Sequence, residues 1–254
     1  MSKDWQVVES ESAEAWDAFV ARSPQRSIFV QTPFLAALRT SFDLVTVREK
    51  GAIVAGAAIA RNADGTATDG VVALTQYQGV LLADHSFLPT HSRISREFKL
   101  LEFFIAELAA RYRNLCLCNS WRLSDLRPFQ WHNYHEPARG RFGIDLRYSA
   151  VLSAASYGTF EGFLTSVRDV RRQEYAKASR SLRIVSDVDE VTFTTLYEET
   201  FARQEIEVPA DELAMMQSIL RSAVANGYGQ LACAFLDDVP VSASLFVYDD
   251  RTAY

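Results

Sequence analysis

The sequence has little of what marks several large protein classes. Its 254 residues include only three cysteines, an odd number spread along the chain, so no disulfide framework is expected. The longest hydrophobic run, Ala52 to Ala60, has nine residues and is too short to span a bilayer. The opening residues, MSKDWQ, carry charges of both signs and no apolar segment follows them, which predicts no signal peptide. We therefore expect a cytoplasmic protein without a membrane span.

Several motifs of common enzyme classes are also absent. There is no GxSxG elbow, no Walker A loop and no GxGxxG fingerprint, which argues against α/β-hydrolase, P-loop NTPase and Rossmann chemistry. His132, His135 and Glu136 are metal-type side chains, but no HExxH motif or cysteine pair accompanies them. A loop with solvated imidazoles is the favoured interpretation, so we expect no metal and no bound cofactor.

Positive charge is scarce overall, because 26 Lys and Arg face 32 Asp and Glu for a net charge of -6. This balance argues against a chain that coats nucleic acid with its whole surface, although a local basic patch is still allowed. Hydrophobic residues, in contrast, make up 48% of the chain, enough for a substantial core. The chain is therefore expected to be globular.

The hydrophobic periods predict a mixed α/β (α+β) protein. Period-two runs predict strands, and apolar residues at helical spacing predict helices. The expected strands are 5–9, 44–48, 52–60, 71–82, 115–119, 229–236 and 239–248. The expected helices are 12–22, 33–40, 92–112, 157–178, 190–204 and 211–226.

An internal similarity suggests two copies of one unit. Residues 53–67 align without gaps on residues 239–253, with four identical pairs in fifteen positions. The identical pairs are Ala57/Ala243, Asp64/Asp250, Thr66/Thr252 and Ala67/Ala253. About eighty residues follow the first copy in its half, and only Tyr254 follows the second. We therefore expect a first domain at 1–150 and a second domain at 151–254 that is incomplete at its C-terminus.

The segment from Ser166 to Arg183 is basic within an acidic protein, with six basic residues against two acidic ones. On a helix, four arginines fall on one arc: Arg168, Arg171, Arg172 and Arg183. Arginine forks suit phosphate, pyrophosphate or carboxylate groups. A solvated helix face is an equally good interpretation. Under the first, Arg168, Arg171, Arg172 and Lys177 bind an anionic substrate, and Tyr175 is placed beside them.

A second candidate segment, Asp125 to Tyr134, gathers aromatic residues, a proline and Arg127 in a predicted loop. Such a cluster stacks a sugar or base, or it covers the edge of a sheet. The two interpretations are weighed equally. Under the first, Trp131 and Tyr134 line the cleft for an acceptor substrate.

Taken in order along nearly the whole chain, these features resemble the FemAB-like branch of the GNAT acyltransferase superfamily. The motifs that carry the resemblance are Trp16 with Phe29-Val30-Gln31-Thr32-Pro33-Phe34-Leu35, Tyr77-x-Gly79-Val80, Asp125-Leu126-Arg127-Pro128-Phe129-x-Trp131-x-x-Tyr134, and Arg168-x-x-x-Arg172-x-x-x-Ala176-x-x-Ser179. The resemblance implies two tandem GNAT-like domains, the second of them truncated here. It departs from the family at the GNAT pyrophosphate loop, because Gln76-x-x-Gly79 is followed by Leu81 where a small residue belongs.

The resemblance also implies an enzyme, an N-acyltransferase that moves an acetyl, acyl or aminoacyl group to an amine of a cell-envelope precursor. The best-known members of the family extend the peptide of peptidoglycan precursors. The donor is then acyl-CoA or aminoacyl-tRNA, and the anionic substrate is acyl-CoA or a nucleotide-sugar precursor. No catalytic residue is assigned. The alternative is a non-catalytic, degenerate GNAT-like module that binds an envelope precursor or a partner protein, and tRNA is a further candidate partner.

Overall fold

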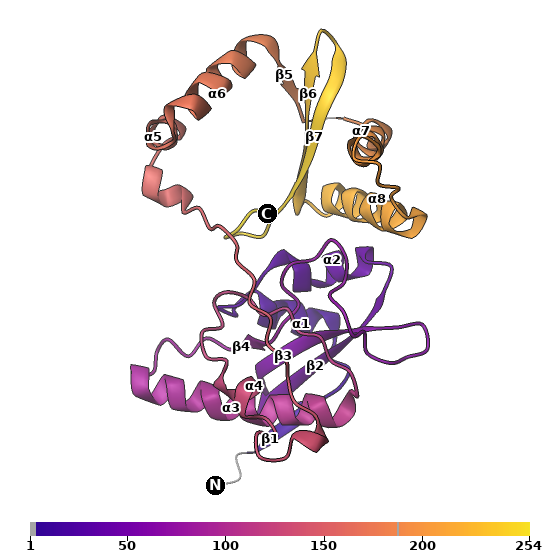
Figure 1. The fold of residues 1–254 in the computed structure, drawn as a ribbon. Coiled ribbons are helices and arrows are strands. Elements are labelled where there is room, and N and C mark those ends of the chain that lie inside the picture. Colours follow the sequence, from indigo (N-terminus) through magenta and orange to yellow (C-terminus); the bar gives the residue numbers. More distant parts are fainter. Residues whose placement is uncertain (1–3, 187) are drawn as a thin grey trace. The chain divides into compact units, whose positions relative to one another are not determined.

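The computed structural model describes residues 4–186 and 188–254 of an α/β protein with antiparallel strand pairing (Figure 1). The chain divides into two compact units, which are described separately. Unit 1 holds the residues up to Gly143 together with Pro209–Gly229 and Val247–Tyr254. Unit 2 holds Ile144–Val208 and Gln230–Phe246. The predicted α/β class is confirmed, whereas the tandem GNAT-like domains remain a prediction.

Unit 1 is built on a four-stranded antiparallel sheet in sequence order. Its strands are β1 (Trp5–Val8), β2 (Ser41–Glu49), β3 (Ala52–Arg61) and β4 (Leu81–Leu82). The long pair β2 and β3 is the centre of the sheet, with Val47 opposite Ala55 and a register shift just beyond that pair. The register places successive residues of β2 and β3 on opposite faces.

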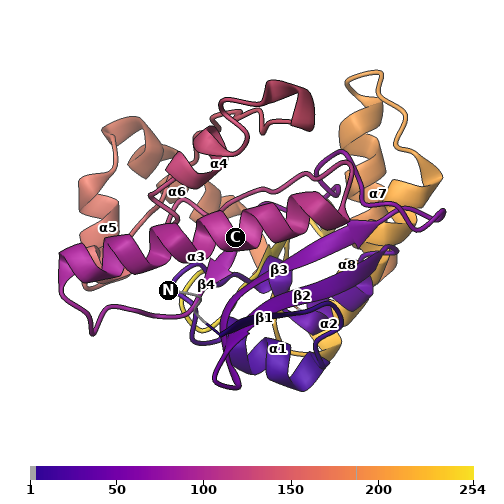
Figure 2. The ribbon, with the colours of Figure 1, turned by 90° about the horizontal axis from the view of Figure 1, so that it is seen from below.

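Helices cover both faces of this sheet. The odd-numbered Val45 and Ala57 join the core cluster with Leu101 and Phe104 of α3 (Thr90–Arg111), the long helix that crosses the sheet in Figure 2. The next residue along β3, Gly56, faces α1 (Ala13–Val20) on the other side. Because both faces are covered, β3 is apolar along its length rather than alternating, which explains its run of alanines.

Trp16 of α1 fixes how this helix meets the sheet. Its side chain is fully buried, and its indole N–H donates to the Val30 carbonyl at 2.7 Å. A Cβ atom on Gly56 would lie 2.8 Å from the Trp16 ring, so only glycine allows the approach. The bond to Val30 holds a short 3-10 turn, Ile28–Val30, which leads into α2 (Thr32–Ala37).

Segments far along the chain complete unit 1. Helix α8 (Ala210–Ala225) lies against α2, where the Ser222 hydroxyl donates to the Pro33 carbonyl at 3.1 Å. The ring of Tyr254 lies 4.8 Å from that of Phe29. Arg26, which is buried, pairs with Asp250 at 2.5 Å. These contacts group 209–229 and 247–254 with the N-terminal residues, so the compact units do not coincide with a division at residue 150.

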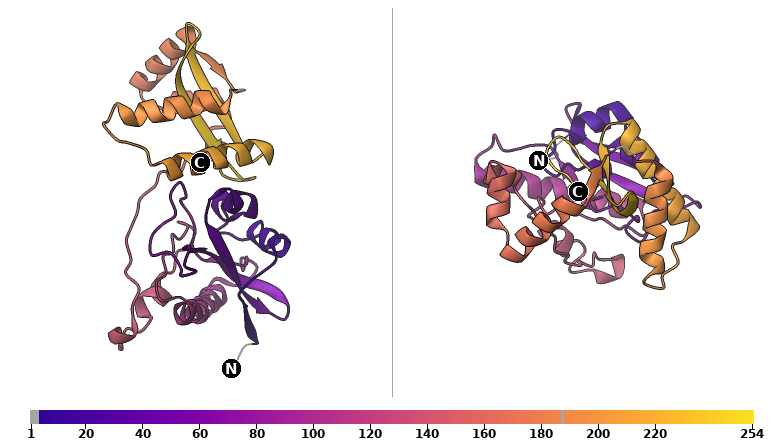
Figure 3. Two further views of the ribbon diagram at one scale, coloured as in Figure 1. Left: turned by 90° about the vertical axis from the view of Figure 1, so that its right-hand side faces the viewer. Right: turned by 90° about the horizontal axis from the view of Figure 1, so that it is seen from above.

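Unit 2 contains a three-stranded sheet in the order β5-β6-β7. Its helical elements are a 3-10 turn (Ala154–Tyr157), α5 (Phe160–Ser166), α6 (Asp169–Ser181) and α7 (Glu190–Ala202). Its strands are β5 (Arg183–Val185), β6 (Gly229–Leu236) and β7 (Val239–Val247), except that the end residues Gly229 and Val247 belong to unit 1. Asp237 and Asp238, both at positive φ, close the β6–β7 hairpin, which is visible in Figure 3. The main buried side chains of unit 2 are Phe193, Leu231 and Cys233.

The two similar segments fold alike locally. Strand β3 is followed by a turn that returns in the Arg61–Ala67 bridge, and β7 by a turn that returns in the Tyr248–Ala253 bridge. In the first turn, the Asp64 carboxylate accepts the backbone N–H of Thr66 at 2.9 Å. In the second turn the equivalent bond comes from Asp249, one residue before the aligned Asp250. The shared strand and return turn explain the sequence similarity without requiring two whole domains.

Three predicted elements are wrong in extent. Residues 71–82 are mostly loop, because regular pairing to β3 is limited to Leu81 and Leu82. The expected strand at 115–119 is reduced to one bridge, Gln78 to Cys118. The helix expected at 157–178 is two helices, because the backbone of Val167 and Arg168 is extended (ψ 158 and 147). Among the described residues, no helix is both long and apolar enough to cross a bilayer.

Glu11 joins the start of α1 to the sheet, and its contacts predict a pH-dependent stability. Its carboxylate accepts from the Arg48 Nε at 3.0 Å and the Thr46 hydroxyl at 3.1 Å. Burial by itself raises the pKa of Glu11, but the bonds from Arg48, the Ser12 N–H and Thr46 outweigh it and hold that pKa below 4.5. Glu11 therefore stabilises the fold above pH 4.5, and this contribution is lost as the pH falls through the lowered folded-state pKa.

We expect Glu11→Gln to lower the free energy of unfolding by about 1–3 kcal/mol at neutral pH, because a charged hydrogen-bond network loses its anion. The difference from the unsubstituted protein should shrink as the pH falls below 4.5, as followed by urea unfolding at several pH values. Glu102→Gln, at an exposed position on α3, is the matched control and should change little. Equal effects of the two substitutions would contradict the role given to Glu11.

Candidate functional site

The predicted basic residues lie together at one helix of unit 2. Arg168 is the N-cap residue of α6, and Arg171, Arg172, Tyr175 and Lys177 follow on that helix. No residue of α6 is buried, so the whole helix surface faces solvent apart from its contacts with α5. The five residues predicted in this segment therefore lie on one exposed helix, but helical spacing places Lys177 on the opposite side of it from Tyr175.

Arg172 bonds to backbone carbonyls at the end of α5, although its side chain is 41% exposed. Its Nη1 donates to the carbonyls of Val167 at 2.6 Å and Thr165 at 3.3 Å, at the C-terminal end of α5. Its Nη2 pairs with Asp169. The last carbonyls of a helix have no partner within the helix, so this guanidinium satisfies them. Arg172 thus holds the bend between α5 and α6, and its place as a substrate contact is the weakest of the predicted set.

The other cations of α6 are more available. Arg171 forms an exposed pair with Glu174 at 2.7 Å, of a kind that contributes little to stability. The side chains of Arg168 and Lys177 form no ion pair with any residue in 4–186 or 188–254. Available positive charge on α6 therefore comes from Arg168, Lys177 and Arg171 of the predicted set, and from Arg180 in the last turn, whose Nε donates to the Ala176 carbonyl.

Aromatic rings join α5 to α6 beside these cations. Phe160 lies 5.4 Å from Tyr175 and 6.1 Å from Phe163, and Tyr157 lies 5.4 Å from Phe163. Tyr175 is 46% exposed although it packs on Phe160. Its ring is therefore part of the contact between the helices and is also partly exposed to solvent.

The two predicted acceptor residues lie in unit 1 instead. Trp131 ends α4 (Arg127–Trp131), which is followed by a 3-10 turn (Pro137–Arg139). The Trp131 ring lies 5.7 Å from Phe98 of α3, and Arg141 lies over the Tyr134 ring at 5.0 Å. Both rings are more than half exposed. Trp131 and Tyr134 thus belong to one exposed aromatic surface, while the basic set belongs to the other unit.

The histidines near this surface are not arranged for a metal. Glu136 pairs with Arg139 at 2.9 Å. Burial, and after it the charge of Arg139, lowers the pKa of His132. Across residues 4–186 and 188–254, no three His, Cys, Asp or Glu side chains are grouped as metal ligands.

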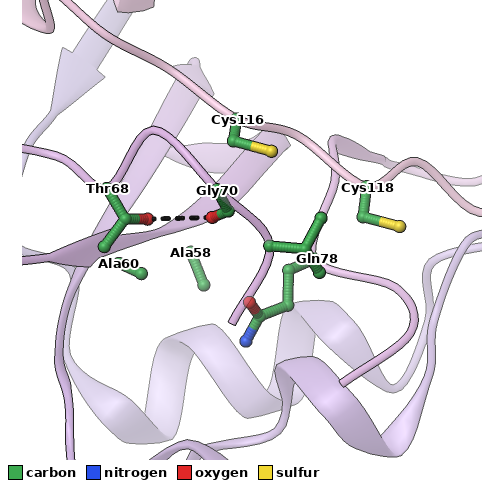
Figure 4. Close-up of a pocket in the computed structure, with 8 residues that line it drawn as sticks. Ala58, Ala60, Thr68, Gly70, Gln78, Cys116 and Cys118 are labelled. Carbon is green, nitrogen blue, oxygen red and sulfur yellow. Dashed lines mark hydrogen bonds between the residues drawn. The ribbon is translucent and has the colours of Figure 1, made fainter. Parts of the chain in front are cut away.

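One site that sequence reasoning missed is a small pocket in unit 1, drawn in Figure 4. Its lining residues are Ala58, Ala60, Thr68, Gly70, Val71, Gln78, Cys116 and Cys118. Cys116 and Cys118 lie two residues apart on one segment and both line the pocket, and the Cys118 thiol donates to the Gln76 carbonyl. The available signal was Gln78, a polar residue just before the apolar run Val80-Leu81-Leu82.

The pocket exists because two neighbouring segments pair only in part. The Cys118 N–H donates to the Gln78 carbonyl at 3.3 Å, as between paired strands. The next hydrogen bond goes to a side chain instead of a backbone carbonyl, because the Val80 N–H donates to Asn119 Oδ1 at 2.9 Å. A Cβ atom on Gly79 would lie 2.5 Å from the Asn119 Cα, so glycine is required there. The partial pairing leaves room between these segments and β3.

No model of a known protein family matches the sequence, and no curated protein matches it. Among solved structures, the crystal structure of FemX is similar over 91% of this chain, with a TM-score of 0.50 and 12% identity. The chain has the fold of FemX. The FemAB-like resemblance of the sequence is thereby confirmed for the fold, and the chain spans 58% of the length of FemX.

The contacts of Arg172 lead to a prediction about local order. Arg172→Ala should raise amide hydrogen exchange at the α5–α6 bend about fivefold, because charge-assisted bonds to the α5 carbonyls of about 1 kcal/mol are lost. Hydrogen-exchange mass spectrometry on peptides covering 160–175 measures it. Arg171→Ala is the matched control, since the Arg171 side chain pairs with the exposed Glu174 and bonds to no α5 carbonyl within residues 4–186 and 188–254. Faster exchange in both variants alike would contradict a specific role of Arg172.

Proposed function

We propose that the chain carries out N-acyl transfer of the FemAB type, in which an acyl or aminoacyl group moves onto an amine of a cell-envelope precursor. The observation that carries this proposal is the likeness to the FemX fold over 91% of the chain. Because the chain spans 58% of FemX at 12% identity, the reaction and its substrates are inferences from fold and resemblance. Both candidate donors are made inside the cell, so we place the reaction in the cytoplasm.

In the proposed reaction, the acceptor amine first loses a proton and then attacks the acyl carbon of the donor. A tetrahedral intermediate forms, and the bond to the thiol of CoA or the ribose oxygen of tRNA breaks. As the C–N bond forms, the attacking nitrogen loses a second proton and becomes an amide nitrogen. The leaving group takes up one proton, so each transfer from a protonated amine releases one proton to solvent. Hydrogen-bond donors aimed at the developing oxyanion and the alignment of two substrates supply much of the rate in such reactions.

The charges on α6 support an anionic substrate. Arg168, Arg171 and Lys177 offer cations on a helix with no buried side, in a protein of net charge -6. Acyl-CoA, a nucleotide-sugar precursor and tRNA all carry phosphates that such a surface attracts. Trp131 and Tyr134 are the contacts proposed for the acceptor in unit 1, where exposed rings can stack on a sugar.

A direct assay tests the reaction. The protein is incubated with a nucleotide-linked peptide precursor and either radiolabelled acetyl-CoA or radiolabelled aminoacyl-tRNA, and the precursor is analysed for transferred label. Label that appears with one donor supports the proposal and identifies the donor. The proposal fails if neither donor transfers label and neither binds in calorimetry.

A charge substitution tests the α6 surface. Alanine at Arg168, Arg171 and Lys177 together should weaken donor or precursor binding roughly tenfold or more, because each exposed ionic contact contributes about 0.5–1 kcal/mol. Calorimetry at two salt concentrations measures the loss, and the salt dependence should become weaker. The charge-matched control replaces Lys99, Arg113 and Arg203, which are exposed elsewhere on the chain. Equal losses in both triple variants would point to net charge rather than to this surface.

A further inference from the structure

One face of the unit 2 sheet is apolar although it faces solvent. Ile184 of β5 lies opposite Ala234 of β6, so their side chains share a face. The two-residue turn between β6 and β7 places Val241 opposite Ala234 in the same row. By the same pairing, Val239 lies opposite Leu236. These five side chains are called the open face, and the four large ones, Ile184, Leu236, Val239 and Val241, are 64%, 41%, 59% and 42% exposed.

The residue pattern of β7 marks this face as the side meant for burial. Val239, Val241 and Leu245 alternate along β7 with Ser242 and Ser244, which point to the opposite face. A half-buried strand directs its apolar side toward a core and its polar side toward solvent. Helices α5 and α6 have no buried residue, so they do not pack on the open face. The apolar side of β7 is therefore available to a partner.

Unit 1 shows what covers the corresponding face there. In the alignment of the two similar segments, Ala55 of β3 is the counterpart of Val241. Ala55 is fully buried, in the core cluster that also holds Leu101 and Phe104 of α3. An amphipathic helix thus covers in unit 1 the position that is exposed in unit 2.

Charges at the hairpin turns favour the same kind of occupant. In unit 1, Glu49 ends β2 beside the β2–β3 turn, and Arg96 in the first half of α3 pairs with it at 2.6 Å. The β6–β7 turn of unit 2 carries two exposed carboxylates, Asp237 and Asp238. Arg183 pairs with Asp238 at 2.8 Å, so Asp237 is the carboxylate assigned to a partner. A helix lying on the open face as α3 lies on its own sheet would complement this charge with a basic residue in its first half.

The dimensions of the open face fit one helix. Strand β6 has eight residues, which at ~3.3 Å each span ~26 Å. Three strands spaced ~4.8 Å apart measure ~10 Å across, which is the width of one helix. A surface of that size offers roughly 300 Å², whereas a stable dimer buries ~800 Å² on each partner. The area therefore favours a helix over the face-to-face pairing of two copies.

We propose that the open face binds an amphipathic helix of a partner protein. The helix would lay an apolar stripe, with large residues at i, i+3, i+4 and i+7, across Ile184, Ala234 and Val241. A basic residue in its first half would pair with Asp237. The inference does not depend on the acyl transfer proposed above, because no residue of the open face belongs to α6.

The probe is a fluorescein-labelled peptide with the sequence of α3, Thr90 to Arg111, because α3 covers the corresponding face in unit 1. Fluorescence anisotropy measures its binding to the full chain, and we expect saturable binding with a Kd of roughly 1–100 µM. A peptide that carries Leu101→Ser, Phe104→Ser and Leu108→Ser should not bind, because its apolar stripe is lost.

Substitutions on the two faces of β7 locate the binding. Val239→Asp with Val241→Asp should weaken binding at least tenfold, because two charges would be desolvated beneath the helix. The matched control, Ser242→Asp with Ser244→Asp, adds the same charges to the opposite face and should bind normally. All four positions are exposed, so the variants should fold. If the first does not, Ile184→Asp makes the same test from β5.

The charge pair is tested by a double-mutant cycle. Asp237→Asn in the protein and Arg96→Gln in the peptide should each weaken binding about threefold. Because they remove the same interaction, the two together should weaken it by clearly less than ninefold. Asparagine suits the positive φ of position 237, so the turn should be kept. Fully multiplicative effects would overturn the assignment of Asp237 to the helix.

Three further outcomes would overturn the proposal. The first is no saturable binding of the peptide, or equal binding to Val239→Asp with Val241→Asp and to the unsubstituted protein. The second is a dimer in sedimentation that the same double substitution abolishes, which would assign the open face to a second copy. The third is flotation with phosphatidylcholine vesicles that the double substitution abolishes, which would assign it to a lipid surface.

Discussion

The close approach of Trp16 to β3 is the packing constraint on which unit 1 depends. The indole lies against Gly56 with no room for a Cβ atom, and its N–H is bonded to the Val30 carbonyl. That single side chain therefore joins α1, the sheet and the turn that leads into α2. Phe29, next to Val30, in turn packs on Tyr254 from the end of the described chain. A residue near the N-terminus thus orders contacts made by residues more than two hundred positions away.

The sequence predicted elements well where the hydrophobic period was long and regular. Helix α3 and the β6–β7 hairpin lie within two residues of their expected ends, because their apolar stripe and turn signals are local. Residues 71–82 were expected as one strand but pair at only two positions, since pairing depends on a partner segment that is itself irregular. The contact of α8 with α2 left no pattern in the sequence from which it could be predicted. Ser222 and Pro33 are small residues whose contact leaves no periodic signal.

Partial strand pairing explains how a fold with few charged core residues can contain a polar pocket. Asn119 supplies the hydrogen bond that a backbone carbonyl would give to Val80, and Gly79 admits the close approach. The hydrogen bonds between the two segments are therefore complete beside the pocket but not within it. Gln78, one residue away, is then buried without a strand neighbour to accept its amide. A regular strand at 115–119 would have closed this space, so the failed strand prediction and the pocket have one cause.

The arginines of α6 illustrate why charge in a sequence does not identify a binding residue. Arg171 and Arg172 are adjacent, equally basic and placed on the same arc by helical geometry. The helix is interrupted at Val167 and Arg168. This interruption brings carbonyls at the end of α5 within hydrogen-bond distance of the Arg172 side chain but not of the Arg171 side chain. Arg172 then bonds to helix carbonyls, while Arg171 pairs weakly with an exposed Glu174. The difference arises from two extended residues between the helices, and a single uninterrupted helix, as periodicity predicted, would have left both side chains in solvent.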